Sequence, residues 1–214
     1  MEVRLLGPVD VVGDDGTVVA VPGQKLQMLL AALAVERGKV VSPDRLVDIL
    51  YGDEPPRQPA NSLQVLVSRL RRSLAGHLGG RVIETSDAGY ALAADAALRT
   101  DLERFEELVA RARPRLADDP GGAVIDLREA LGLVRGEPLA GLPGDGWARA
   151  ERVRLTEARL AAVEDRIDAD LATGGHAAVV GELERLTARH PLRDRKSTRL
   201  NSSHSSPSRM PSSA

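Results

Sequence analysis

Five Arg residues occur together in a stretch of the chain that contains no acidic residue. Residues 55–83 hold no Asp or Glu. The five cations in this stretch are Arg57, Arg69, Arg71, Arg72 and Arg81. Guanidinium groups bind phosphate oxygens bidentately, and the Ser, Asn and Gln side chains between them hydrogen-bond to polar edges. These residue types predict a surface for an anionic partner with polar edges, and the phosphates and bases of DNA meet both requirements.

The same stretch has the periodicity of an amphipathic helix over about residues 60–74. Its apolar residues repeat at helical spacing and form one face. They are Leu63, Leu66, Val67, Leu70 and Leu74. The Arg and polar residues lie at the flanks of this face or opposite it. Such a helix can pack its apolar face on a domain and place its cationic face in a DNA major groove, which is about 12 Å wide and admits one helix.

A solvated helix on an ordinary small domain is the alternative, because exposed helix faces often carry several charges. The neighbouring elements favour DNA binding. In the first 21 residues, alternating and β-branched segments lie on both sides of a Gly/Asp turn, and this pattern predicts a small antiparallel sheet. One helix is expected over residues 24–36, and a second begins at Ser42 and Pro43, an N-cap followed by a proline. Residues 81–92 predict a hairpin, and this order of elements predicts a winged helix-turn-helix with an N-terminal β-sheet.

From about residue 100 onward the pattern is helical throughout. We expect helices over residues 100–116, 120–134, 147–172 and 176–189. The last pair turns at Gly174-Gly175 and resembles the second half of a tetratricopeptide repeat. The fold class is therefore an α+β winged helix-turn-helix followed by an all-α, tetratricopeptide-like helical domain.

Composition divides the chain into three parts. We expect a winged-helix DNA-binding domain at 1–95, a helical domain at 96–195, and a disordered tail at 196–214. The tail contains eight Ser, whereas the preceding 195 residues contain five. Its sequence resembles a translated sequencing adapter, so we expect the tail to be non-native and the helical domain to be truncated.

Several classes of function are disfavoured by residues that the sequence lacks or scatters. It has no Cys, and its four His lie far apart, so neither a thiolate site nor a clustered metal site is expected. The Gly-rich segment 141–146 lacks the Lys-Ser/Thr of a phosphate-binding loop. No apolar run reaches the ~18 residues of a membrane span. We therefore expect no catalytic site, no cofactor, no metal and no membrane, and a cytoplasmic location.

Several motifs resemble one known family of regulators. Residues 62–72 resemble the recognition helix of response-regulator-type winged helices. Residues 3–8 and 24–26 resemble the start of the actinobacterial antibiotic-regulatory activators, and residues 104–108 resemble the start of that family's bacterial transcriptional activator domain. The resemblance covers about residues 1–195. It implies a transcriptional activator, not an enzyme, that binds direct repeats of double-stranded DNA and regulates a biosynthetic gene cluster such as that of an antibiotic.

The resemblance also assigns roles to individual residues. Ser62, Val65, Ser68, Arg69 and Arg72 are expected to face the major groove. Among them, Val65 would touch a thymine methyl group, and Arg69 would read a base or hold a phosphate. Asn61 and Arg71 are expected to contact phosphates.

The predicted wing departs from the family pattern. Gly89-Tyr90 after the wing turn matches, but the tip Ser86-Asp87-Ala88 has no basic residue and Ala91 follows Tyr90. Insertion of the wing into the minor groove therefore depends on Arg81 and Thr85, the remaining candidates.

The resemblance implies further partners. The helical domain is expected to contact RNA polymerase and to mediate self-association on DNA, with the protein at the nucleoid. Two alternatives remain open at this point. One is a tetratricopeptide-like interaction scaffold whose winged helix binds protein, and the other is the N-terminal fragment of a larger regulator with an ATPase module.

Overall fold

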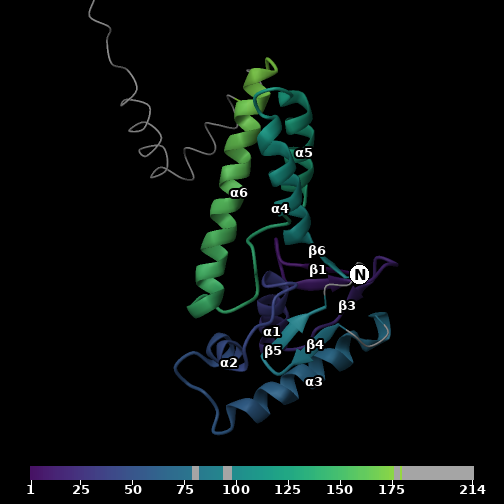
Figure 1. Cartoon of the computed structure of the whole chain (residues 1–214), viewed down its shortest axis with the longest axis vertical. Coiled ribbons are helices and arrows are strands. Elements are labelled where there is room, and N and C mark those ends of the chain that lie inside the picture. Colours follow the sequence, from purple (N-terminus) through teal and green to yellow (C-terminus); the bar gives the residue numbers. More distant parts are fainter. Residues whose placement is uncertain (79–81, 94–97, 176–178, 180–214) are drawn as a thin grey trace, which may run out of the picture.

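The structure of the chain is a computed structural model that describes residues 1–78, 82–93, 98–175 and 179 of 214. The sheets and the first helices of the chain form one end of the molecule, and the later helices form the other (Figure 1). Arg81, the tail at 196–214 and all of the predicted helix at 176–189 except Val179 lie outside the described residues.

The predicted N-terminal sheet is confirmed, and it contains a strand that the sequence pattern did not indicate. Three antiparallel strands come from the start of the chain: β1 (Glu2–Arg4), β2 (Asp10–Val12) and β3 (Val18–Val19). A further strand, β6 (Arg99–Thr100), pairs with β1 in parallel, so the order is β3-β2-β1-β6. This pairing places the start of the helical part directly on the N-terminal sheet.

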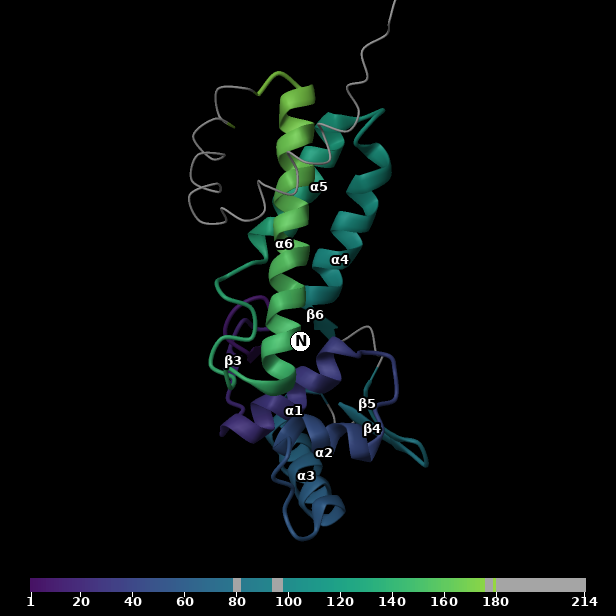
Figure 2. The same ribbon diagram turned by 90° about the vertical axis from the view of Figure 1, so that its left-hand side faces the viewer.

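The three predicted helices of the winged helix are present as α1 (Gln24–Val35), α2 (Pro43–Tyr51) and α3 (Pro59–Leu78). The predicted cap of α2 is confirmed, because the Ser42 side chain accepts a hydrogen bond from the Arg45 backbone N–H at 3.2 Å. In α3 the five predicted apolar residues are all buried. They pack α3 across α1 and α2 at the lower end of the molecule (Figure 2).

The predicted hairpin is the wing, formed by β4 (Ile83–Ser86) and β5 (Gly89–Leu92). The wing is tied to the α1–α2 connection by two backbone hydrogen bonds between Val41 and Tyr90, at 2.8 and 3.0 Å. Gly89 has a φ of 144°, and a Cβ there would lie 2.1 Å from the Val41 carbonyl oxygen. Only glycine allows the wing to approach this connection so closely.

The helical part consists of α4 (Asp101–Ala112), the short 3₁₀ helix η1 (Arg113–Arg115), α5 (Pro120–Gly132) and the long α6 (Gly146–Ala172). The helices α4 and α5 form a pair that packs along α6 (Figures 1 and 2). Side chains cap the starts of α4 and α5: Thr100 accepts a hydrogen bond from the Glu103 N–H, and Asp119 accepts one from the Gly122 N–H, each at 2.9 Å. Val179 packs against Val163 and Ile167 of α6.

Among the described residues, no helix combines the length and apolarity that crossing a bilayer requires.

A buried joint fastens the helical part to the sheet. Asp101, the first residue of α4, is 2% exposed, and its two carboxylate oxygens accept the backbone N–H groups of Leu5 and Leu6 at 2.7 and 3.0 Å. The loop after α5 adds a hydrogen bond of 2.9 Å from the Leu139 N–H to the Leu5 carbonyl. The segment that follows β1 is therefore held between two segments of the helical part.

Arg152 of α6 organises that loop. Its guanidinium group donates to the backbone carbonyls of Pro138, Leu139, Leu142 and Pro143 at 3.2–3.4 Å. Around the joint one apolar core is continuous from Met1 to Ala169. The winged helix and the helical part are thus packed as one body in the described structure. The predicted boundary at 95/96 lies among residues that the structure does not describe.

Candidate nucleic-acid interface

The helix α3 exposes one continuous polar stripe opposite its buried face. The exposed members, called the α3 stripe below, are Asn61, Gln64, Val65, Ser68, Arg69 and Arg72. They are spaced three and four residues apart, which places them on one side of a helix. Val65 is apolar and yet 43% exposed. The α3 stripe therefore combines amide, hydroxyl, methyl and guanidinium groups on one surface.

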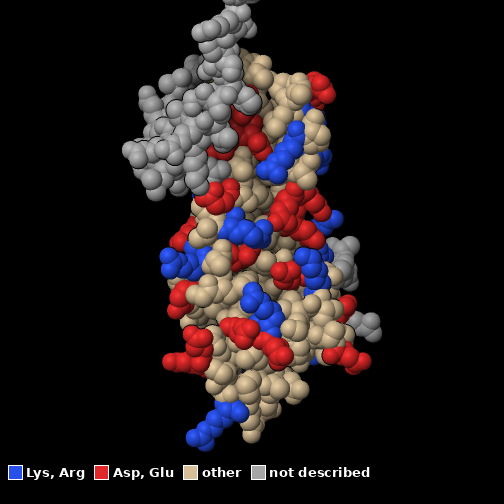
Figure 3. Space-filling model, turned by 60° about the vertical axis from the view of Figure 1, so that its left-hand side comes forward, with Lys and Arg blue, Asp and Glu red and all other residues tan. Residues whose placement is uncertain are grey.

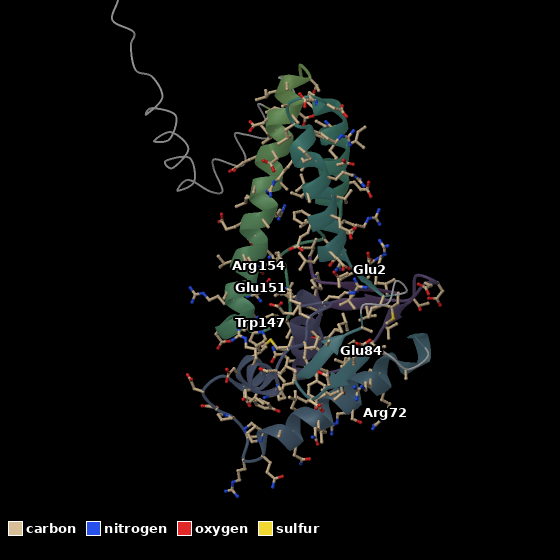
Figure 4. All side chains as sticks on the ribbon, viewed as in Figure 1. Glu2, Arg72, Glu84, Trp147, Glu151 and Arg154 are labelled. Carbon is tan, nitrogen blue, oxygen red and sulfur yellow. The ribbon has the colours of Figure 1, made fainter. Side chains whose placement is uncertain are left out.

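The structure places most of the predicted contact residues on this stripe. Asn61, Val65, Ser68, Arg69 and Arg72 belong to it, and Ser62 lies half-buried at its margin. Arg72 lies on α3 at the end of the molecule opposite the top of α6 (Figure 4). No residue in the first turn of α3 is acidic, so the positive end of the helix dipole is not neutralised there.

Gln64 was not among the predicted contacts, although it is exposed within the stripe. Its spacing of three residues from Asn61 and four from Ser68 is the signal that identifies it. The buried neighbours Leu63 and Val67, 1% and 2% exposed, anchor the opposite side of the helix and fix its rotation.

One face of the molecule carries basic side chains at its lower tip (Figure 3). Acidic and basic side chains are mixed over most of the face shown in Figure 3, and basic atoms project from its lower tip. That tip is the end at which α2 connects to α3 (Figure 1). An acid-free stripe at one end of a mixed surface favours an anionic partner at that end.

Arg71 holds the wing against α3. Its Nε and Nη2 atoms donate to the Ile83 carbonyl at 3.2 and 2.8 Å, and Nη2 also donates to the Thr85 hydroxyl at 2.6 Å. Arg71 and Thr85, which were predicted separately as DNA contacts, are therefore hydrogen-bonded to each other. Their predicted contacts with DNA stay predictions, and the structure adds a positioning role for Arg71.

We expect Arg71→Ala to lower the free energy of unfolding by about 1–2 kcal/mol, because Ile83 and Thr85 lose a charged donor. Urea denaturation measures the loss, and amide hydrogen exchange should rise across residues 83–86 of the wing. The neighbouring Arg72→Ala is the matched control, since the Arg72 side chain is exposed. Equal stability and equal exchange in the two variants would contradict the positioning role.

The described wing is acidic rather than basic. Glu84 and Asp87 are both exposed on it, and no Lys or Arg occurs between residues 82 and 93. Glu84 of the wing and Arg72 of α3 lie at the same end of the molecule (Figure 4). Carboxylates repel a phosphate backbone, so the wing by itself contributes little attraction to DNA.

Lys25 supports the end of α2 that leads into α3. Its ammonium group lies 3.5 Å from the centre of the Tyr51 ring and donates to the Leu50 carbonyl at 3.3 Å. Burial lowers the pKa of Lys25. A cation at a helix C-terminus is favourable there, because it satisfies a terminal carbonyl and opposes the helix dipole.

Other surfaces of the described residues hold no comparable constellation. No group of three or more His, Asp or Glu within them could hold a metal ion. A pocket of about 360 Å³ lies between α2, the end of α1 and Trp147, which is labelled in Figure 4. Its lining includes aliphatic side chains, Arg45, and Glu36 and Lys39, which form an exposed ion pair of 3.2 Å with each other.

Comparisons with known proteins identify two domains in the order that the fold shows. Residues 20–92 match the family described as transcriptional regulatory protein, C terminal. Residues 100–202 match the bacterial transcriptional activator domain. The first match contains α1 to the wing, and the second begins at the joint, so the winged helix-turn-helix and the helical activator domain are both confirmed.

Relatives that match most of this chain are regulatory proteins of Streptomyces and Mycobacterium. The chain is 41% identical over 192 residues to the regulatory protein AfsR of Streptomyces coelicolor, with 89% of this chain and 19% of AfsR covered. It is 34% identical over 204 residues to the regulatory protein DnrI of Streptomyces peucetius, with 91% of this chain and 74% of DnrI covered.

A solved structure has the same arrangement. Mycobacterium tuberculosis EmbR, in complex with a low-affinity phosphopeptide, superposes with a TM-score of 0.82 at 32% identity, over 90% of this chain and 51% of EmbR. The chain thus spans about a fifth of AfsR and about half of EmbR. Both matched domains and the named relatives are those of transcription regulators and do not belong to an enzyme family. On these domains and relatives, the chain belongs to the Streptomyces antibiotic regulatory protein family.

Proposed function

We propose that this protein is a sequence-specific transcriptional activator of a biosynthetic gene cluster that inserts α3 into the major groove of direct repeats. The observation that carries this is the acid-free α3 stripe, exposed on a winged helix in a family of transcription regulators. The place of action is the nucleoid, in the cytoplasm.

Each residue of the interface has a role in the proposal. Val65 contacts a thymine methyl group, Arg69 reads a base or holds a phosphate, and Ser62, Ser68 and Arg72 complete the major-groove surface. Asn61 contacts a phosphate at the start of α3. For Arg71 a phosphate contact comes in addition to its bonds with the wing, and Thr85 and Arg81 are the contacts of the wing region.

The helical part is proposed to mediate contact with RNA polymerase and self-association on DNA. The joint at Asp101 supports this role, because it fixes the direction in which the helical part leaves the DNA-bound end. Two protomers on direct repeats would then present their helical parts with a constant offset, which favours a repeated contact between neighbours.

Binding to one repeat and to two repeats tests the proposal. The duplexes are selected from randomised DNA, and the affinity is measured at several salt concentrations. We expect the logarithm of the affinity to fall linearly with the logarithm of salt, by roughly 0.9 per neutralised phosphate. Two protomers should bind cooperatively to two repeats that are spaced by one or two helical turns of DNA.

Two results would count against the proposal. Absence of salt-dependent duplex binding would favour a protein-binding scaffold. Independent binding to the two repeats would remove self-association while leaving DNA binding in place.

A further inference from the structure

We infer that Gln64 reads an adenine at one position of each repeat and is thereby a determinant of sequence preference. This rests on the proposed function and goes beyond it, because it assigns a base to a residue that the family resemblance did not single out.

The length of the α3 stripe separates its middle from its ends. Asn61 and Arg72 are eleven residues apart, which corresponds to about 16 Å at a rise of 1.5 Å per residue. A major groove is only about 12 Å wide. When α3 crosses the groove, the two ends of the stripe therefore come near the flanking phosphates. The middle, Gln64 to Ser68, spans about 6 Å and lies over the base edges.

The charges of the stripe agree with this division. The middle holds the uncharged Gln64, Val65 and Ser68, while Arg72 lies at one end and Arg69 next to the middle. Arg57, which is also exposed, precedes the other end in sequence. The cation at the Arg72 end and Arg57 before the Asn61 end match phosphates, and neutral groups in the middle match base edges.

Among the three middle residues, Gln64 alone carries both an amide donor and a carbonyl acceptor. Adenine presents an N7 acceptor and an N6 amino donor side by side in the major groove, and a Gln amide matches this pair bidentately. Val65 lacks polar atoms, and the Ser68 hydroxyl accommodates several bases. Gln64 also lies in the N-terminal half of α3, the part of a recognition helix that contacts bases in helix-turn-helix proteins.

The experiment compares the base preferences of four chains on randomised duplexes: wild type, Gln64→Ala, Gln64→Glu and Gln24→Ala. Gln24 is an exposed glutamine at the start of α1, outside the α3 stripe, and is the matched control. We expect the wild type and Gln24→Ala to prefer adenine at one position by roughly 5- to 150-fold over the other bases. Gln64→Ala should lose that preference, and Gln64→Glu should shift it to cytosine, whose N4 amino group donates to a carboxylate.

The outcomes separate the inference from the proposed function. If Gln64→Ala selects the same sequences as the wild type, or if the wild type has no adenine preference, Gln64 is not a base reader and duplex binding still stands. If the wild type selects no duplex at all, the proposed function fails, and the inference fails with it. Replacing the selected adenine by 7-deazaadenine should weaken the wild type and leave Gln64→Ala unaffected at that position.

Discussion

Replacing Asp101 by Ala is expected to lower the free energy of unfolding by about 2–4 kcal/mol. The side chain is buried, and it accepts the backbone N–H groups of both Leu5 and Leu6. Removing it leaves two buried donors without a partner, at roughly 1–3 kcal/mol each. Burial raises the pKa of Asp101 against the opposing effect of its donors. The cost of burying the Asp101 charge therefore offsets part of the stabilisation that its hydrogen bonds provide. The expected loss of unfolding free energy is accordingly smaller than the sum of the two donor penalties.

Urea denaturation followed by circular dichroism measures this loss. Asp168→Ala is the control, because Asp168 is an exposed carboxylate on the same body, on α6. We expect the control to change stability by less than about 0.5 kcal/mol. Equal stabilities for the two variants would show that the Asp101 carboxylate does not fasten the helical part to the sheet.

Replacing Arg69 by Ala is expected to weaken binding to a selected duplex by about 1–3 kcal/mol if Arg69 reads a base. The loss should be largest on the selected site and smaller on duplexes altered at the base that Arg69 contacts. Within the proposed major-groove surface, Arg72 lies at the end of the α3 stripe, where the phosphates that border the groove are nearest. Arg72→Ala should therefore weaken all duplexes alike and reduce the salt slope by about 1.

Gel shifts at several salt concentrations distinguish these two behaviours. Arg159→Ala is the control, since Arg159 is an exposed cation on α6, away from α3. It should leave both affinity and slope unchanged. If neither Arg69→Ala nor Arg72→Ala weakens binding, α3 is not the recognition helix.

The elements of the winged helix could be predicted because their signals are local. The apolar residues of α3 recur within one or two helical turns, and all five are buried as expected. Ser42 and Pro43 begin α2 through a bond that spans three residues. Side-chain periodicity and capping act over such short separations, so the faces and most ends of the helices follow from neighbouring residues.

The partners of individual polar residues could not be predicted in the same way. An Arg beside the recognition face, such as Arg71, is expected to contact a phosphate. Only the position of the wing shows that its guanidinium group donates hydrogen bonds to the Ile83 carbonyl and the Thr85 hydroxyl. From the sequence, Asp101 is only an acidic residue at the start of a predicted helix. Its hydrogen bonds reach Leu5 and Leu6, which lie 96 and 95 positions earlier in the chain.

By itself, the sequence determined the order of the helices and of every strand except β6, the buried face of α3 and the acid-free stripe opposite it, because periodicity and charge are properties of neighbouring residues. The tertiary structure decided the pairing of β6 with β1, the joint at Asp101, the Arg152 contacts and the clamp of Arg71 on the wing. These contacts depend on which distant segments meet when one continuous core closes. Many packings are compatible with one periodicity, and the physical reason that one is selected is that it buries the apolar faces while giving the buried polar groups partners.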